Sequence, residues 1–176
     1  TGIFKDANFA QMKYDNAGEI FGYRFSRQIK IMKVENYSTE LSDIKICSGV
    51  YFSDERGSLK KAIHGDEIIM LMPNIREVLC TTSQKNVIRG LHYQMKKPQG
   101  KFISVMKGKI IDVAVDLRKN SKTYGKHFKI ILSENNGKSV YIPKGFAHGF
   151  GGLEKENLVI YSCNNYRFKA GERGIL

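Results

Sequence analysis

The chain has 176 residues, of which 41% are hydrophobic and 26% are charged, which is the composition of one globular domain and excludes a disordered chain. No apolar run reaches the roughly 20 residues that a membrane-spanning helix needs, so no membrane partner is expected. Lys and Arg number 29 against 17 Asp and Glu, a formal net charge of +12, and this excess favours an anionic partner.

The N-terminal residues 1–31 mix polar and aromatic side chains without a sustained period, and we treat them as an N-terminal extension. A different sequence pattern begins at Met32, where a start codon is plausible, so residues 32–176 are predicted to form one domain. From residue 44 onward, short apolar runs alternate with turn signals, and no segment up to residue 163 shows a helical stripe. Strands are predicted over residues 46–52, 67–72, 102–106, 110–117, 128–132, 139–142 and 158–161.

Short turn signals separate two pairs of these strands. Lys107-Gly108-Lys109 predicts a hairpin between residues 102–106 and 110–117. Asn136-Gly137 supplies the positive φ of a tight turn between the next two strands. Many short strands at this spacing predict an all-β protein, either a sandwich or a barrel.

In the strand predicted over residues 110–117, side chains alternate with the period of two that is typical of a half-buried strand. Its two sides are Ile111, Val113 and Val115 on one and Asp112, Ala114 and Asp116 on the other. The two aspartates fit either solvent-facing positions or the wall of a pocket, and the pattern assigns them no role.

The three cysteines, Cys47, Cys80 and Cys163, are odd in number and far apart, and none forms a CxxC pair. This spacing predicts free thiols rather than a disulfide framework or a zinc cluster. Free thiols are typical of the reducing cytoplasm, where we expect the protein to reside.

Two segments carry reactive side chains inside predicted strands. The first contains His92-Tyr93-Gln94, where alternation would put Ile88, His92 and Gln94 on one face. The second, from Gly137 to His148, has the spacing G-x5-P-x-G-x2-H and resembles the second cupin motif. The matching first motif needs H-x-H to bind a metal, and Gln94 takes the place of one ligand. A cupin with no metal and no cofactor is therefore predicted.

Longer motifs make the resemblance more specific. They are Asp54-Glu55-Arg56-Gly57, Arg89-Gly90-Leu91-His92-Tyr93-Gln94, Gln99-Gly100-Lys101, residues 112–118, residues 142–150 and Glu172-Arg173-Gly174-Ile175. Together they resemble the dTDP-4-dehydrorhamnose 3,5-epimerase (RmlC-like) family over about residue 44 to the C-terminus. The resemblance implies the double-stranded β-helix, or jelly-roll barrel, of the RmlC-like cupins.

It also implies a reaction, whose chemical needs can be stated independently. A 4-keto group acidifies the C–H bonds at C3 and C5 of a sugar. Epimerisation then requires a base on one face, a group that stabilises the enolate, and an acid on the other face. By resemblance, His92 is the base, Lys101 the enolate stabiliser and Tyr161 the acid.

The remaining site residues follow from the resemblance as substrate contacts. Arg89 would hold the substrate, and His148, Gln94 and Arg167 would line the same pocket. Arg56 would reach the nucleotide diphosphate of the partner subunit, which implies a homodimer and a nucleotide-sugar substrate. The positive charge of the chain agrees, because arginine forks bind diphosphates well.

The chain also differs from the family pattern. The aspartate that orients the catalytic histidine lies near the C-terminus in the family and has no counterpart up to Leu176. Glu77-Val78-Leu79 stands where the family has Gln-x-Asn, and Leu59 and Lys61 replace an aromatic residue and a glutamate. Arg167 replaces a second tyrosine.

The leading hypothesis is a sugar-nucleotide epimerase of surface-polysaccharide synthesis that acts at C3, C5 or both. One alternative is a catalytically weak or inactive relative that binds a nucleotide sugar without epimerising it. A second alternative, a nucleic-acid-binding β-barrel, is favoured by the charge alone. The basic residues are spread along the chain rather than gathered in a stripe, so no nucleic-acid partner is predicted.

Overall fold

The computed structural model describes residues 19–20, 23–24, 33–36, 41, 43–49, 51–62 and 69–175. The strands are β1 (Glu19–Ile20), β2 (Tyr23–Arg24), β3 (Lys33–Asn36), β4 (Lys45–Ser48), β5 (Tyr51–Asp54), β6 (Gly57–Lys60), β7 (Glu77–Gln84), β8 (Ile88–Gln94), β9 (Lys101–Lys107), β10 (Lys109–Asp116), β11 (His127–Ser133), β12 (Lys138–Ile142), β13 (Phe146–Gly152), β14 (Glu156–Cys163) and β15 (Glu172–Gly174). A 3-10 helix, η2, spans Lys169–Gly171. None of the helical segments in these ranges is long and apolar enough to span a membrane.

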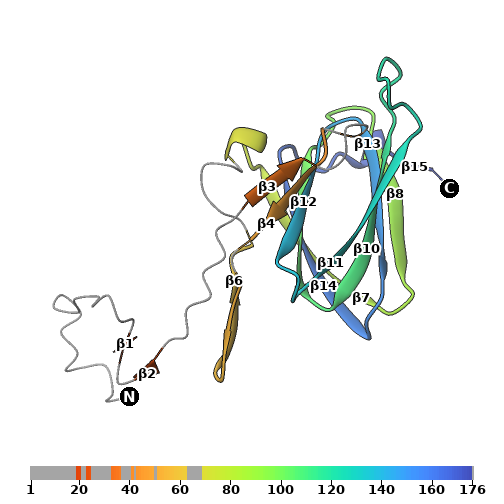
Figure 1. The fold of residues 1–176 in the computed structure, drawn as a ribbon. Helices are drawn as coiled ribbons and strands as arrows, with labels where there is room; N and C mark the ends of the chain where they lie inside the picture. The colour runs from red at the N-terminus through yellow and green to blue at the C-terminus, as the bar shows by residue number, and fades with distance from the viewer. Residues whose placement is uncertain are drawn as a thin grey trace.

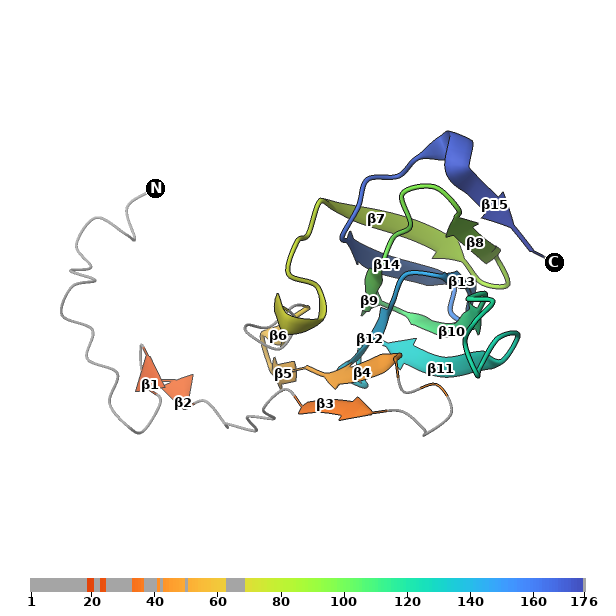
Figure 2. The same ribbon diagram turned by 90° about the horizontal axis from the view of Figure 1, so that it is seen from above.

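Eleven of the described strands form two antiparallel sheets that face each other around one interior, and β1-β2 and β5-β6 form separate two-stranded sheets (Figure 1, Figure 2). One sheet has the order β11-β10-β13-β8-β15, and the other has the order β3-β4-β12-β9-β14-β7. Strands that follow one another in the chain therefore often lie in opposite sheets, as in a jelly roll. The predicted all-β jelly-roll class is confirmed. Most of residues 1–31 lie outside the described ranges, so the domain boundary at residue 32 stays a prediction.

The predicted hairpin around Lys107-Gly108-Lys109 is wrong. Strand β9 pairs with β12 and β14, whereas β10 pairs with β11 and β13, so the chain passes from one sheet to the other at Gly108. The turn at Asn136-Gly137 has the expected positive φ of 63° at Gly137, and it also connects strands of different sheets. Alternation within a strand identifies the strand but not its partner, so the sequence pattern cannot show that β9 and β10 belong to different sheets.

Two predicted strands differ in extent from the observed ones. The run over residues 46–52 is divided between β4 and β5, with Gly49 outside both. Residues 69–71 of the strand predicted over 67–72 form a helical turn, and residues 67–68 lie outside the described part. Met72, at the end of this turn, is buried with Cys47 and Phe102 in a small second cluster. The apolar run thus packs as a helical turn rather than as a strand.

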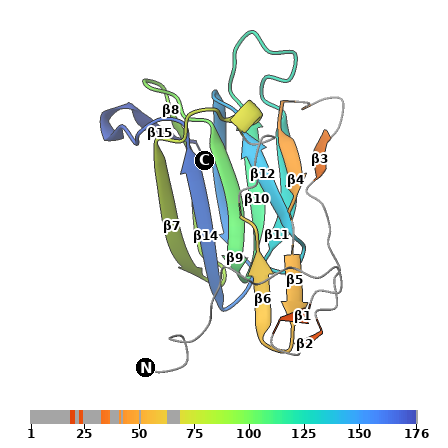
Figure 3. The same cartoon turned by 90° about the vertical axis from the view of Figure 1, so that its left-hand side faces the viewer.

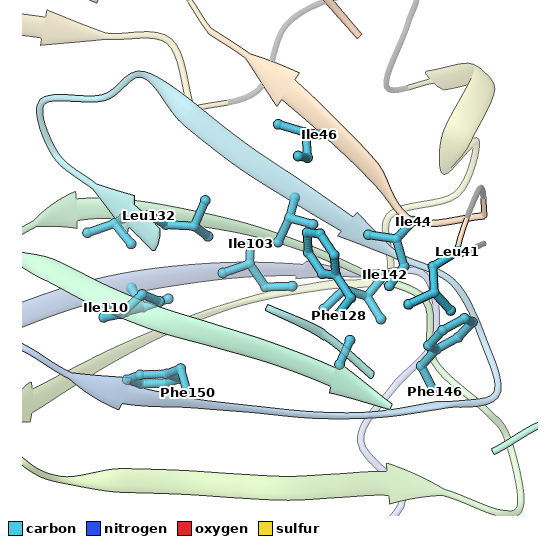
Figure 4. Packing of buried hydrophobic residues seen from close by; sticks show 14 residues of the cluster. Leu41, Ile44, Ile46, Ile103, Ile110, Phe128, Leu132, Ile142, Phe146 and Phe150 are labelled. Carbon is cyan, nitrogen blue, oxygen red and sulfur yellow. The ribbon is translucent and has the colours of Figure 1, made fainter. Parts of the chain in front are cut away.

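The main hydrophobic core fills the space between the two sheets (Figure 4). It is built from buried aliphatic and aromatic side chains of both sheets, among them Ile103, Ile142, Ile110, Phe128, Phe146 and Phe150. On β10 the predicted alternation is confirmed, and the side with the aspartates is the buried one: Asp112 and Asp116 are both 0% exposed. A buried carboxylate needs partners, and the two aspartates find different ones.

Asp116 is held by a local structural network. Its carboxylate accepts hydrogen bonds from the Arg118 guanidinium at 2.7 and 2.9 Å and from the hydroxyls of Ser121 and Thr123. Burial acts to raise the pKa of Asp116, but these hydrogen bonds outweigh burial and hold the pKa well below its usual range. Arg118 also stacks over the Phe146 ring, 4.7 Å from its centroid. Asp116 therefore stabilises the end of β10.

The β5–β6 hairpin forms an arm whose tip projects away from the barrel (Figure 1, Figure 3). The base of the arm is fixed by Lys60, whose ammonium donates to the carbonyl oxygens of Val105 at 2.9 Å and Ser133 at 3.1 Å. These acceptors belong to β9 and β11, so one side chain joins both sheets. Burial lowers the pKa of Lys60 to about 8, and Glu134 acts in the opposite direction.

A bulge between β8 and β13 decides which side chains of β8 face the interior. Arg89 lies opposite Phe150 and His92 lies opposite His148, so two residues of β8 oppose the single Gly149. Arg89 and His92 consequently share the face of Phe150 and His148. Ile88 is 80% exposed on the other side, so the predicted common face of Ile88 and His92 is wrong.

Two glycines allow the strands to approach at this bulge. Gly90 has φ 114°, and a Cβ there would lie 2.6 Å from the carbonyl oxygen of His148. A Cβ on Gly149 would lie 3.0 Å from the Cα of Gly90. Both positions thus exclude a side chain unless β8 moves away from β13.

We expect Gly90→Ala to lower the free energy of unfolding by more than about 2 kcal/mol, because backbone strain and overlap with β13 add. Gly125→Ala is the matched control: Gly125 also has positive φ, 76°, but a Cβ there meets nothing within 4 Å. Its cost should be only the backbone strain of about 1 kcal/mol. Chemical denaturation measures both, and equal losses would contradict the close approach.

Candidate active site

A buried pair of side chains joins the neighbouring strands β10 and β13. His148 on β13 and Asp112 on β10 are 4% and 0% exposed, and His148 Nε2 lies 2.8 Å from Asp112 Oδ2. An Nε2–H that donates to the carboxylate leaves Nδ1 as the ring atom available to a ligand. Asp112 Oδ1 is also buried and has no hydrogen-bond partner among the described residues. The sequence assigns Asp112 no role, because the alternation on β10 does not indicate that the side with the aspartates is the buried one.

Tyr161 reaches the same interior from the opposite sheet. It lies on β14, with its ring edge-on to the His148 ring at 6.0 Å and tilted to Phe150 at 6.3 Å. Burial raises the pKa of the Tyr161 phenol well above its usual range, and the Asp112 carboxylate adds to this effect. The phenol therefore keeps its proton at neutral pH and can act as a proton donor.

Lys101 begins β9 and lies opposite Cys163 of β14 in the strand register. By alternation its side chain shares the inner face of Ile103 and Val105, both of which are 0% exposed. Burial lowers the pKa of Lys101 from its ordinary value, while the Cys163, Glu172 and Asp112 side chains act to raise it. Lys101 is thus a partly desolvated cation beside the buried pair.

His92 occupies the solvent-accessible side of this group. It lies between His148 of β13 and Gly174 of β15 in the strand register, and it is exposed. The Glu172 carboxylate lies close enough that His92 contributes to the lowering of the Glu172 pKa, after the larger effect of Arg167. The structure thus brings His92, His148, Lys101 and Tyr161 to one region, and their roles stay predictions.

Arg89 is oriented by two contacts from β7. Its Nε donates to Ser83 Oγ at 2.8 Å and its Nη2 donates to the Thr82 carbonyl oxygen at 3.0 Å. The guanidinium is therefore fixed in direction while the residue stays exposed. A pre-oriented arginine suits the recognition of an anionic or hydroxyl-rich ligand.

Gln94 has contacts that the sequence did not indicate. Its Nε2 donates to the carbonyl oxygens of Lys97 at 2.8 Å and Tyr166 at 3.3 Å, and its Oε1 accepts from the Phe168 backbone N–H at 2.6 Å. The amide thus holds the segment before β15 against the end of β8. A contact of Gln94 with substrate stays a prediction.

Arg167 and Arg56 lie in different places. Arg167 pairs with Glu172, its Nη2 lying 2.8 Å from Oε2, and its backbone N–H donates to Glu77 Oε1. Arg56 lies in the turn of the β5–β6 arm, which leaves the barrel on the side away from β8 and β15 (Figure 2). The structure therefore brings Arg167, but not Arg56, to the group around His92 of the same chain.

The described residues contain no group of three or more His, Cys, Asp or Glu side chains placed to hold a metal ion. Two of the side chains considered for such a site have other partners: His148 binds Asp112, and Gln94 binds backbone groups. The expectation of a metal-independent site stays a prediction.

Comparisons with known proteins identify relatives of one family. Curated dTDP-4-dehydrorhamnose 3,5-epimerases of Methanothermobacter thermautotrophicus and Shigella flexneri are 40% and 39% identical to the chain; each alignment covers 78% of this chain and 75% or 78% of the relative. A Legionella pneumophila RmlC structure, in complex with dTDP-4-keto-L-rhamnose, superposes with a TM-score of 0.77 at 36% identity, covering 82% of this chain and 78% of that one.

A Sulfolobus tokodaii dTDP-4-dehydrorhamnose 3,5-epimerase structure superposes with a TM-score of 0.74 at 40% identity, covering 82% of this chain and 81% of that one. The family model described as dTDP-4-dehydrorhamnose 3,5-epimerase matches residues 38–176. This match includes every strand from β4 to β15 and all the residues of the group around His92. The chain belongs to the dTDP-4-dehydrorhamnose 3,5-epimerase family.

Proposed function

We propose that the protein epimerises a dTDP-linked 4-keto-6-deoxyhexose at C3 and C5 in the biosynthesis of surface-polysaccharide sugars. The observation that carries this proposal is the placement of a histidine and a protonated tyrosine on opposite sheets, with a buried His–Asp pair between them. His92 comes from β8 and Tyr161 from β14, and His148 lies opposite His92 and 6.0 Å from the Tyr161 ring. The ligand of the Legionella pneumophila relative supports the substrate class.

His92 acts as the base in this mechanism. The 4-keto group acidifies the C3 and C5 protons, and an imidazole can accept a proton from carbon when it is held in contact. Its exposed position on β8 lets the sugar enter from solvent. Abstraction places negative charge on the C4 oxygen, which then needs donors.

Lys101 and His148 supply those donors. The Lys101 ammonium brings a positive charge into a partly desolvated interior, where charge–charge interactions are stronger than in water. His148 is held by Asp112 through Nε2 at 2.8 Å, which fixes the ring, and when both ring nitrogens carry a proton Nδ1–H can donate to the C4 oxygen. Donors that are already in place need no reorganisation as the enolate forms.

Tyr161 returns a proton from the opposite side. Its phenol stays protonated because burial and the Asp112 carboxylate raise its pKa. Delivery from the face opposite His92 inverts the carbon, whereas return of the proton by His92 restores the original configuration. The stereochemical result therefore depends on the separation of these two groups.

The nucleotide is held at the open side of the site. Arg89, oriented by Ser83 and Thr82, contacts the substrate, with Gln94 and Arg167 at the same mouth. In a homodimer, Arg56 contacts the diphosphate of the nucleotide bound to the partner subunit. The β5–β6 arm that carries Arg56 projects from its own barrel, which fits this role (Figure 3). Among the described residues, Cys47, Cys80 and Cys163 form no disulfide with one another, which fits a cytoplasmic protein.

We expect His92→Ala and Tyr161→Phe to fail in different ways. His92→Ala should abolish both epimerisation and the exchange of C3 and C5 protons with D2O, because no enolate forms. Tyr161→Phe should abolish inversion but keep partial exchange, since His92 can return deuterium to the original face. Each loss should be about 10²–10⁴-fold, measured by NMR on the 4-keto sugar nucleotide.

The control variant is His127→Ala, which removes an exposed histidine from β11 and should leave both rates unchanged. Exchange that persists in His92→Ala would contradict the assignment of the base. A wild-type protein that binds the nucleotide sugar but exchanges neither proton would favour the binding-only alternative.

Arg56 gives a test of the homodimer. We expect the chain to be a dimer by light scattering, and Arg56→Ala and His92→Ala to be poorly active when each is alone. Their co-expression should restore about a quarter of the wild-type activity, because half of randomly mixed dimers have one intact site. A monomer, or no recovery on mixing, would contradict the supply of Arg56 by the partner.

A further inference from the structure

The β5–β6 arm leaves the barrel as a two-stranded hairpin, and a hairpin of this kind is at best marginally stable in water by itself. Residues 55–59, at the tip of the arm, are exposed. The strand register pairs Tyr51 with Lys60 at the base of the arm and Asp54 with Gly57 at its tip. The direction of the arm therefore depends on the contacts that its base makes with the barrel (Figure 3).

Hydrogen bonds hold the chain on both sides of the hairpin. Before the arm, the Gly49 N–H donates to the Gly137 carbonyl oxygen at 2.6 Å. After the arm, Ser104 Oγ donates to the Ala62 carbonyl oxygen at 3.1 Å. These two contacts fix where the chain enters and leaves the arm. Lys60 belongs to the hairpin itself, so its contacts act directly on the direction in which the hairpin projects.

The Lys60 ammonium is fixed between two strands of opposite sheets. It donates to the carbonyl oxygen of Val105 on β9 at 2.9 Å and to that of Ser133 on β11 at 3.1 Å. Burial lowers the pKa of Lys60 to about 8 while Glu134 acts to raise it, so most of the ammonium keeps its charge at pH 7. Hydrogen bonds from a charged donor are stronger than those between neutral groups. Two such bonds to separate strands hold the side chain in one orientation.

Arg56 lies in the turn at the tip of this arm, three residues beyond Lys60 along the ladder. At about 3.4 Å per residue, the tip is on the order of 10 Å from the base, so a change of about 10° at the base moves the tip by about 2 Å. Hydrogen bonds between nitrogen and oxygen span only about 2.7–3.2 Å. A displacement of that size would consequently break a contact between Arg56 and a bound anion.

We propose that Lys60 is a positioning residue: its hydrogen bonds to Val105 and Ser133 set the direction of the arm and thereby place Arg56 against the diphosphate bound to the partner subunit. This inference rests on the proposed function. It adds that nucleotide binding in one subunit depends on a contact inside the barrel of the other, made by a side chain that points away from the nucleotide.

The first measurement is backbone hydrogen–deuterium exchange of the full chain by mass spectrometry, without any ligand. In Lys60→Met, the amides of residues 51–60 should exchange about tenfold faster or more, because two charge-assisted hydrogen bonds are lost. Strands β9 and β11 should keep their protection. Lys60→Gln, which keeps a shorter neutral donor, should have a smaller effect in the same direction. Lys61→Met is the matched control, since Lys61 is the next residue and is exposed; it should leave the exchange unchanged.

The second measurement is the Kd of dTDP by calorimetry, which needs no reaction. Arg56→Ala should weaken binding about 10–100-fold through the loss of a charge-assisted contact, and Lys60→Met should weaken it by a similar factor. Lys60→Arg, which keeps the charge and the donors, should bind nearly as the wild type does. The double variant should bind no more weakly than Arg56→Ala, because both changes remove the same contact. With the 4-keto sugar nucleotide, Lys60→Met should raise KM and change kcat little.

Three results would overturn the proposal: unchanged exchange of the arm in Lys60→Met, faster exchange of β9 and β11 in place of the arm, or additive losses in the double variant. Wild-type affinity of Lys60→Met for dTDP would overturn it as well. A wild-type protein that binds dTDP but exchanges no sugar proton overturns the proposed epimerisation alone, because the two measurements on Lys60→Met still decide its role. A wild-type protein that does not bind dTDP overturns both.

Discussion

The contact of β8 with β13 at Gly90 and Gly149 is the constraint on which the site depends. A regular strand would place Arg89 and His92 on opposite faces, because they are three residues apart. The bulge places both on the face of His148 and Phe150. Only residues without a Cβ allow the backbones this close. The common face of Arg89 and His92 thus rests on two glycines that carry no reactive group.

Inside this frame, the buried Asp112 carboxylate organises the charges. It fixes the His148 ring, adds to the effect of burial on the Tyr161 phenol, and acts on the Lys101 ammonium. A buried carboxylate is costly unless it is paired. Here Asp112 is paired with His148, so the pair satisfies a buried carboxylate in the folded protein and also orients a ring that the proposed reaction uses.

The sequence motifs predicted the all-β class, the family and the histidines that the structure brings together, because those residues occur in long, ordered patterns. Strand pairing could not be predicted from the local sequence, because a turn within a hairpin and a turn between two sheets look alike in sequence. At Gly108 the chain passes from β9 in one sheet to β10 in the other. Asp112 was missed because an apolar side normally faces the core, and here the aspartate side does. The bulge at Gly90 also changes which residues of β8 share a face, and the sequence gives no sign of it.

The central claim is that His92 and Tyr161 contact opposite faces of one sugar ring inside the barrel. A crystal structure of the protein with a dTDP-4-keto sugar tests it most directly. The account predicts His92 and Tyr161 in contact with opposite faces of the ring, Lys101 or His148 at the C4 oxygen, and an unchanged His148–Asp112 hydrogen bond. A sugar bound outside the barrel, or with both side chains on the same face, would contradict it.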